Sequence, residues 1–265
     1  MKKEASVVIR CNNDERVFNC ISSIDADVEI IVVLNENPNL KRRLERQDVI
    51  CRTSPPGNLS IVSNIGFEST TTDKVIITDS DTLFSKNCIR KMIVGLDTYD
   101  IVRSPLRFQK GQAFLSREIA EARDYVNALP VVYTPGIGVT KRLPSRVKGF
   151  LFDNGIPFAV DANLNFRIQK EALPVLYLQD VWIEHLAEDV HHDLHAARRI
   201  GVGCRESREN LHVLYPQITK RDIGKSLKGV KFVYYPDMLK KKGVRVLMYQ
   251  ILWDLWYYAG YYFAD

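Results

Sequence analysis

The chain has 265 residues, of which 46% are hydrophobic and 26% charged, and its formal net charge is +5. This length suffices for one α/β domain with a full core, and the ordinary composition excludes disordered, collagen-like and coiled-coil proteins. The five cysteines form no Cys-x-x-Cys pair, which favours reduced thiols over a disulfide framework or a zinc site. Because the first residues lead directly into a short apolar run, we expect no secretory signal and a cytoplasmic protein.

Apolar and polar segments alternate regularly through the first third of the chain. The expected strands are residues 5–10, 29–34, 49–52 and 75–78, and the expected helices between them are 16–24, 40–46 and 59–69. This alternation implies right-handed crossovers, a parallel sheet and the α/β fold class. No Gly-x-Gly-x-x-Gly is present, and Gly224-Lys225-Ser226 lacks the first glycine of the P-loop motif Gly-x-x-x-x-Gly-Lys-Ser/Thr, because residue 219 is Thr. The Rossmann dinucleotide and P-loop modes of binding are therefore excluded. We expect residues 1–100 to bind a nucleotide or similar phosphate ligand by other means.

Two aspartates follow the apolar strand at 75–78. Asp79 and Asp81, separated by Ser80, lie where open α/β sheets bind ligands, at the carboxyl end of a strand. Two carboxylates so close repel one another unless a cation intervenes, and hard oxygen ligands favour Mg²⁺ or Mn²⁺, either of which bridges to a diphosphate. The alternative is that Asp79 caps the next helix and Asp81 is solvated. The motif alone does not decide between the two.

Three stretches of the first half occur in a fixed order: SVVIRCNNDERVFNCISSI, VEIIVVLNENP and SNIGFESTTTDKVIITDSDT. Together they resemble the nucleotide-binding half of family 2 glycosyltransferases, which have the GT-A fold. Asn64 and Gly66 match the family's Asn-x-Gly, and Asp79 and Asp81 match its Asp-x-Asp. The resemblance implies a Rossmann-like, mostly parallel sheet flanked by helices, and a nucleotide-sugar donor, with a UDP-sugar favoured. The residues expected to contact this donor are Arg10, Asn12, Asn35, Asn64, Asp79, Ser80, Asp81 and Arg198.

The segment VDANLNFRI at 160–168, in the expected acceptor half 101–219, resembles the family's Glu-Asp-x-x-Leu-x-x-Arg helix start. Asp161, Leu164 and Arg167 match this pattern, whereas Val160 replaces its first acidic residue. A carboxylate at a helix start can take a proton from an attacking sugar hydroxyl. On spacing alone a helix cap is the commoner role for Asp161, and the resemblance favours the general base.

A histidine ends the next predicted strand, Val181 to His185. The resemblance implies that His185 completes a metal site with Asp79 and Asp81, and imidazole is an acceptable ligand for Mn²⁺. The following histidines fit no structural zinc pattern, and we interpret most of them as helix surface.

The chain also departs from the family pattern. Asn35 stands where an acidic residue often holds the base or ribose, and Ser63 where an arginine often precedes the Asn-x-Gly. The processive signature Gln-x-x-Arg-Trp is absent, so we expect one sugar to be transferred per encounter.

The C-terminal tail, residues 220–265, is separated from the catalytic domain 1–219 by its composition. Residues 220–245 carry nine Lys or Arg against two Asp, a net charge of +7, so the remainder is −2 (5 − 7). The basic and aromatic segment 240–263 predicts an amphipathic helix that contacts a membrane surface peripherally, or packs on the catalytic body or a second subunit. Asp254 near the middle of this segment argues against a helix that spans the membrane. Membrane contact would place the protein on the inner face of a membrane.

These features predict an inverting, metal-dependent glycosyltransferase acting on a glycan, lipid-linked or small-molecule acceptor. One alternative is a haloacid dehalogenase-type phosphatase with Asp79 as nucleophile, although Leu83 replaces the threonine or valine expected there. A non-enzymatic alternative is a basic nucleic-acid-binding protein or an inactive transferase relative. Because the positive charge is confined to the tail and no nucleic-acid-binding motif accompanies it, nucleic acid is not an expected partner.

Overall fold

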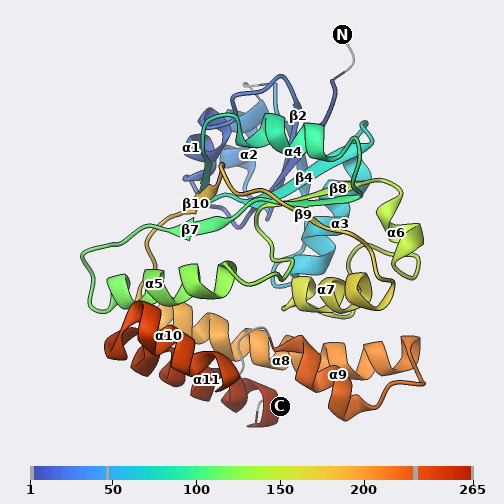
Figure 1. Ribbon diagram of the computed structural model, residues 1–265. Helices are drawn as coiled ribbons and strands as arrows, with labels where there is room; N and C mark the ends of the chain where they lie inside the picture. Colours follow the sequence, from blue (N-terminus) through green and yellow to red (C-terminus); the bar gives the residue numbers. More distant parts are fainter. Residues whose placement is uncertain (1–2, 46–47, 229–231, 264–265) are drawn as a thin grey trace.

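A computed structural model describes residues 3–45, 48–228 and 232–263 (Figure 1). Its central sheet has seven strands in the order β3-β2-β1-β4-β8-β6-β9. The strands are β1 (Ser6–Cys11), β2 (Glu29–Leu34), β3 (Ile50–Thr53), β4 (Lys74–Asp79), β6 (Ile101–Arg103), β8 (Ile137–Thr140) and β9 (Leu176–Tyr177). All neighbouring pairs are parallel except those of β8, which is antiparallel to both β4 and β6. The prediction of an α/β fold with a mostly parallel sheet is confirmed.

The strands of this sheet are apolar on both faces because helices cover both faces. Successive residues of β1 alternate between two cores: Val7 and Ile9 face one, and Val8 faces the other. The first core includes residues of α1 (Val17–Ser22), α2 (Pro38–Glu45) and α4 (Cys88–Gly95). The second includes residues of α3 (Leu59–Ser69), α6 (Leu143–Arg146) and α7 (Val160–Lys170). The helix expected at 40–46 begins earlier, at Pro38, since proline suits a first helical position.

A second, three-stranded sheet lies at the carboxyl ends of the central strands. Its order is β5-β10-β7, with β5 (Thr82–Phe84) antiparallel and β7 (Leu106–Phe108) parallel to β10 (Ile183–His185). In this register His185 lies opposite Thr82. The small sheet therefore brings the histidine of a late strand next to Asp81 in the turn after β4.

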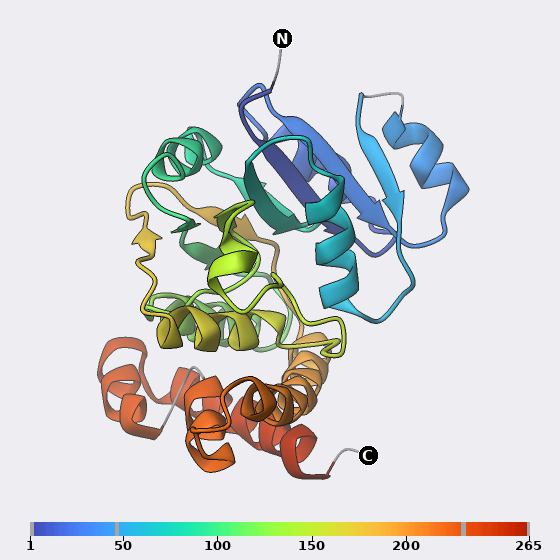
Figure 2. The same cartoon turned by 90° about the vertical axis from the view of Figure 1, so that its right-hand side faces the viewer.

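Helices from the C-terminal part of the chain form a separate layer below the sheet and its covering helices (Figures 1 and 2). They are α8 (Val190–Leu214), α9 (Lys220–Leu227), the 3₁₀ turn η1 (Phe232–Tyr234), α10 (Tyr235–Lys242) and α11 (Val244–Phe263). Between this layer and the sheet lie α7 and α5 (Ser116–Asn127), the latter in the stretch that the sequence left unassigned.

Two glycines allow α8 and α11 to approach closely. A Cβ on Gly201 would lie 2.1 Å from the Tyr257 carbonyl oxygen, and one on Gly260 would lie 2.0 Å from that of Arg198. Asp254 is buried, and Lys228 lies 3.1 Å from its carboxylate. The last helix thus packs on α8 of the catalytic body, one of the arrangements expected for the tail. Within the ranges described, none of the helices has both the length and the apolar character needed to cross a membrane.

The five cysteines are free and buried, as reduced thiols require. The division into domains at residue 219 stays a prediction.

Candidate active site

Asp79 at the end of β4 is bound by Arg10 of the neighbouring strand β1. Arg10 Nε donates to Asp79 Oδ1 at 2.6 Å, and Arg10 Nη2 donates to Oδ2 at 2.9 Å. Arg10 is buried, and its Nη1 also reaches the hydroxyl of Ser63 at 3.5 Å. Such a bidentate pair holds both charges in fixed geometry. Asp79 lines the cavity described below, but its charge is already offset by the protein.

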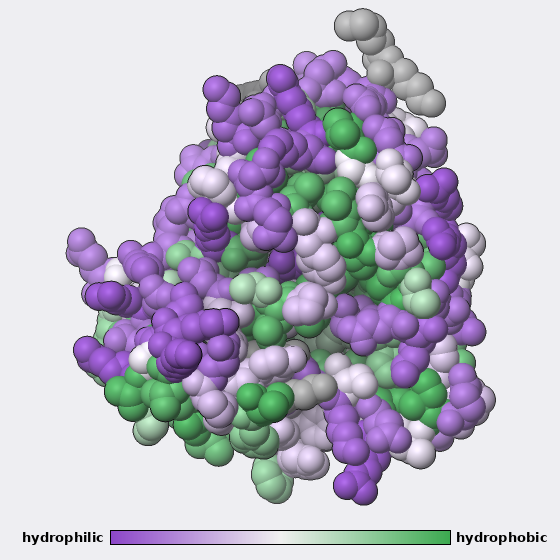
Figure 3. Space-filling model, viewed as in Figure 1, coloured by the Kyte–Doolittle hydropathy of each residue, from purple (hydrophilic) through white to green (hydrophobic). Residues whose placement is uncertain are grey.

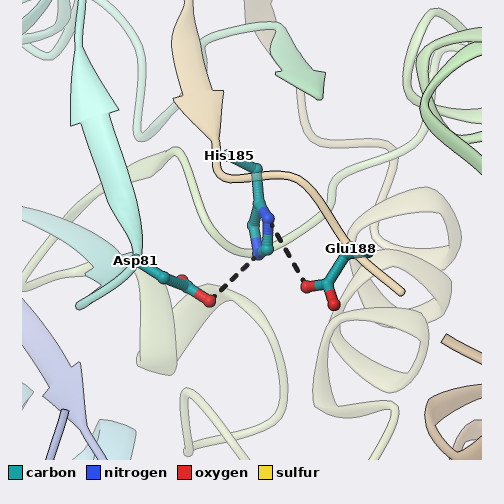
Figure 4. Close-up of side chains that lie close together, drawn as sticks. All are labelled: Asp81, His185 and Glu188. Carbon is teal, nitrogen blue, oxygen red and sulfur yellow. Dashed lines mark ion pairs between the residues drawn. The ribbon is translucent and has the colours of Figure 1, made fainter. Parts of the chain in front are cut away.

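Asp81, His185 and Glu188 form a compact cluster beside this pair (Figure 4). His185 Nε2 lies 3.4 Å from Asp81 Oδ2, and His185 Nδ1 lies 3.6 Å from Glu188 Oε1. One potential ligand atom from each residue can be chosen so that all lie within 4.8 Å of one another. His185 Nδ1 also lies 2.9 Å from the Leu186 carbonyl oxygen. In the neutral tautomer whose Nδ1–H donates a hydrogen bond to that oxygen, Nε2 carries a free lone pair.

The carboxylates of this cluster are in an environment that disfavours their charge. Burial raises the pKa of Asp81, the nearby Asp79 raises it further, and His185 and Arg16 oppose the shift. Burial also raises the pKa of Glu188. Asp81 Oδ1 is buried without a hydrogen-bond partner among the residues that the structure describes.

Two carboxylates and one imidazole suit Mn²⁺, and Mg²⁺ less closely because Mg²⁺ prefers oxygen. The unpartnered oxygen of Asp81 and the free Nε2 of His185 provide two ligand atoms that a cation would satisfy. These residues therefore fit a divalent ion. The sequence predicted Asp79 as the third ligand beside Asp81 and His185, whereas the cluster contains Glu188.

A cavity of about 320 Å³ adjoins this cluster, and its lining includes Asp79, His185, Glu188 and Asp161. Asp161 is the second residue of α7 and is not its cap, which is Ala159. Its carboxylate accepts hydrogen bonds from the backbone N–H of Ala162 at 2.9 Å and of Thr134 at 3.3 Å. Burial raises the pKa of Asp161, against the effect of these bonds and of Arg10. A carboxylate with a raised pKa that faces a cavity can act as a general base.

The other predicted donor-binding residues take different positions. Asn12 and Asn35 follow the adjacent strands β1 and β2, and their side chains hydrogen-bond each other. The buried Ser80 lies between the two aspartates, and its hydroxyl is 3.4 Å from Asp14 Oδ2. All three lie at the same sheet edge as Asp79, as expected.

Asn64 and Arg198 lie elsewhere. The amide of Asn64 donates to the Phe152 carbonyl and to Asn154 Oδ1, each at 2.8 Å, which ties α3 to the loop before α7. Arg198 is exposed on α8 and lines a separate hollow with Trp256. Neither residue lines the cavity that Asp161 shares with His185 and Glu188, so neither belongs to the proposed site.

Two features of the site were not found from the sequence. The first is Glu188. It lies three residues after His185, and a carboxylate so close to a predicted metal ligand could have been recognised in the sequence as a second ligand. The other feature is the wall built by α11, from which Gln250, Trp253 and Tyr257 line the cavity. No local pattern connects them to Asp161.

Comparison with solved structures places this architecture among known folds. Two structures of S. aureus TarS 1-349, the second of them in complex with UDP-GlcNAc, each match with a TM-score of 0.54, at 14% and 17% identity. The matches cover 99% and 97% of this chain and 81% and 89% of those chains. GalNAc-T7 with UDP, GalNAc and Mn²⁺ matches with a TM-score of 0.57 at 12% identity, over 96% of this chain and 57% of that one. This chain has the GT-A fold. No protein-family model matches the sequence, and no curated protein does so.

Proposed function

We propose that the protein is a metal-dependent, inverting glycosyltransferase of the family 2 type, which transfers one sugar from a UDP-sugar to an acceptor hydroxyl. The observation that carries the proposal is that His185 and Glu188, two members of a cluster fitted for a divalent ion, line the same cavity as Asp161, a carboxylate with a raised pKa. This cavity lies at the carboxyl edge of the sheet, where α/β folds bind ligands. The GT-A fold and the order of the sequence motifs support the same activity.

Asp81, His185 and Glu188 would hold Mn²⁺ or Mg²⁺. When bound, the ion supplies positive charge that stabilises the departing diphosphate. Arg10 holds the Asp79 carboxylate in a fixed position, so that its outer edge can accept a hydrogen bond from a hydroxyl of the donor. Asp161 accepts the proton of the acceptor hydroxyl while that oxygen forms its bond to the anomeric carbon. The bond from this carbon to the diphosphate oxygen breaks on the opposite face, which inverts the configuration.

The donor is proposed as a UDP-sugar because TarS is solved with UDP-GlcNAc and GalNAc-T7 with UDP and GalNAc. The deciding experiment measures thermal stabilisation by UDP, GDP and CMP with and without Mn²⁺, followed by mass spectrometry of reactions with the matching sugar nucleotides. A shift that requires both UDP and Mn²⁺ would support the proposal, since a ligand that binds only the folded state raises its stability. No shift with any nucleotide would refute it.

The pairing of Asp79 argues against the phosphatase alternative. Arg10 donates a hydrogen bond to each of its carboxylate oxygens, which stabilises the carboxylate and makes it a weaker nucleophile. Hydrolysis of a phosphate monoester that is lost in Asp79→Asn would revive it.

Peripheral contact with an anionic, cytoplasm-facing membrane is a further part of the proposal. Apolar side chains are exposed on α11, including Met248, Leu255 and Trp256, and Lys240 and Lys241 lie on the adjoining α10. Figure 3 shows an apolar patch at the lower left, where Figure 1 places α10 and α11. A basic and apolar surface of this kind suits anionic headgroups.

Sedimentation with vesicles tests this contact. Binding to phosphatidylserine vesicles at low salt should fall in Leu255→Ser and be retained in Val94→Ser, an exposed apolar position on α4. Equal binding of the two variants, or equal binding to neutral vesicles, would argue against it.

A further inference from the structure

Part of the cavity wall is aromatic. Trp253 and Tyr257 of α11 and Tyr133 from the loop before β8 line it. Trp253 is only 9% exposed; its ring stacks on that of Tyr257 at 5.9 Å between centroids, and the guanidinium of Arg123 lies over it at 4.5 Å. This aromatic wall lines the same cavity as Asp161.

Two uncharged donors of this wall, Trp253 Nε1 and the Tyr133 hydroxyl, are buried and have no hydrogen-bond partner in the part of the chain that the structure describes. Arg123 Nε has none there either, although it lies 3.9 Å from the Asp193 carboxylate. Burial raises the pKa of Tyr133, so its hydroxyl keeps its proton at neutral pH. A buried donor without a partner costs free energy, and it is typically explained by an ordered water or a ligand. A ligand that carries oxygen atoms would satisfy both groups.

The cations of this wall are already paired with protein groups. Arg123 Nη2 donates to Gln250 Oε1 at 2.9 Å, and Arg123 Nε lies 3.9 Å from Asp193. Lys228 lies 3.1 Å from Asp254. The cavity also contains Asp161 and Glu188, neither of which has a Lys or Arg within ion-pair distance in the described ranges. With Glu188 assigned to the metal, an anionic ligand on this wall would meet the Asp161 carboxylate and only cations that Asp193 and Asp254 already offset, which disfavours it.

We infer that the aromatic wall contributed by α11 is the acceptor subsite and that it takes an uncharged glycoside ring. This inference rests on the proposed function, because it identifies the acceptor of the same site. A pyranoside ring has an apolar face of C–H groups that can pack against the aromatic wall, and hydroxyls that can accept from Trp253 Nε1 and Tyr133 Oη. Thr134, whose N–H bonds Asp161, directly follows Tyr133, so the loop that positions the ring also positions the base.

Conservative variants separate this subsite from the fold. Trp253→Phe keeps an aromatic ring and removes the indole N–H, and Tyr133→Phe removes only the hydroxyl. The matched controls are Trp256→Phe and Tyr262→Phe, which make the same changes at exposed positions of α11. Calorimetry would titrate each protein, saturated with UDP and Mn²⁺, with methyl glycosides of glucose, galactose and N-acetylglucosamine, and with methyl glucuronide and glucose 6-phosphate as anionic probes.

We expect at least one neutral glycoside to bind the wild type and both controls, and to bind Trp253→Phe and Tyr133→Phe about three- to tenfold more weakly, as expected for one lost hydrogen bond. With that glycoside as acceptor, KM should rise by the same factor while kcat changes little. UDP should bind all five proteins equally. Preference for the anionic probes, unchanged affinity in the two variants, or no binding of any neutral glycoside at millimolar concentration would overturn the inference. Failure of UDP to bind the wild type would instead refute the transferase itself, and the inference with it.

Discussion

Arg10 and Asp79, 69 residues apart in the chain, form two hydrogen bonds across neighbouring parallel strands, at 2.6 and 2.9 Å. This pairing separates the roles of two aspartates that the sequence presents as equivalent. Asp79 is neutralised by the protein, whereas Asp81 has a raised pKa and an unpartnered buried oxygen. Only the second of the two needs an external cation.

Substitution of each aspartate should therefore have opposite consequences. Asp79→Asn leaves the buried Arg10 without a counter-charge and should lower the free energy of unfolding by about 2–4 kcal/mol. Asp81→Asn should leave stability unchanged or slightly higher, because it removes a buried charge, and should abolish the stabilisation that requires both UDP and Mn²⁺. Urea unfolding and thermal shift measure the two effects. Equal losses of stability in both variants would contradict this separation.

Glu188 should contribute to metal affinity. Glu188→Gln is expected to weaken Mn²⁺ binding by about tenfold or more, since even residues that only support metal ligands typically contribute that much. Glu184→Gln is the matched control, because Glu184 precedes His185 on β10 and points to the other side of the strand. Titration of Mn²⁺ followed by calorimetry would compare the two. A similar effect in both variants would remove Glu188 from the ligand set.

Asp161 should determine the acid side of the pH profile. A general base works only when ionised, and burial raises the pKa of Asp161, so kcat should begin to fall at a higher pH than an ordinary aspartate would cause. Asp161→Asn should lower kcat by roughly 10²–10⁴-fold and leave UDP binding intact. Steady-state rates of wild type and variant, measured between about pH 4 and pH 8, test the acid limb of the profile and the loss of kcat. Residual activity close to that of the wild type would identify another base.

The same raised pKa has a consequence for stability, with a defined sign. Ionised Asp161 is less favourable in the folded state than in the unfolded state, so it destabilises the protein as pH rises above the unfolded value of about 3.9. Below that pH both states are protonated and the penalty vanishes. Asp161→Asn should therefore be more stable than the wild type at neutral pH and gain nothing in acid. Urea unfolding at neutral pH and in acid measures the free energy of unfolding of both proteins. If the pKa of Asp161 were not raised, the difference between variant and wild type would be the same at both pH values.

Gly260 should be required for α11 to dock on α8. Alanine normally stabilises a helix relative to glycine by about 1 kcal/mol. Here the added Cβ would meet the Arg198 carbonyl at 2.0 Å, so Gly260→Ala should instead destabilise the protein by roughly 1–3 kcal/mol. Because α11 also lines the cavity, UDP-dependent transfer should weaken while the metal cluster stays intact. A stabilised Gly260→Ala would show that the two helices can separate without strain.

The sequence by itself determined the strands and helices of the first half and the position of Asp-x-Asp at a strand end. These features are local: β-branched runs with turns on either side define strands such as β4, and the edge at which Asp79 and Asp81 lie follows from the parallel order. The position of Asp161 at a helix start was equally local. The choice between base and cap needed its burial and its cavity.

Tertiary structure alone decided which side chains meet. Arg10 reaches Asp79 because β1 and β4 are neighbours in the sheet, and His185 reaches Asp81 because β10 pairs with β5. The tail was ambiguous because its apolar residues suit a membrane as well as a protein core. The close approach of α8 and α11 at their glycines, and the buried pair of Lys228 and Asp254, place one face of α11 against the cavity. Contacts of this range depend on packing between distant segments, which no local pattern encodes.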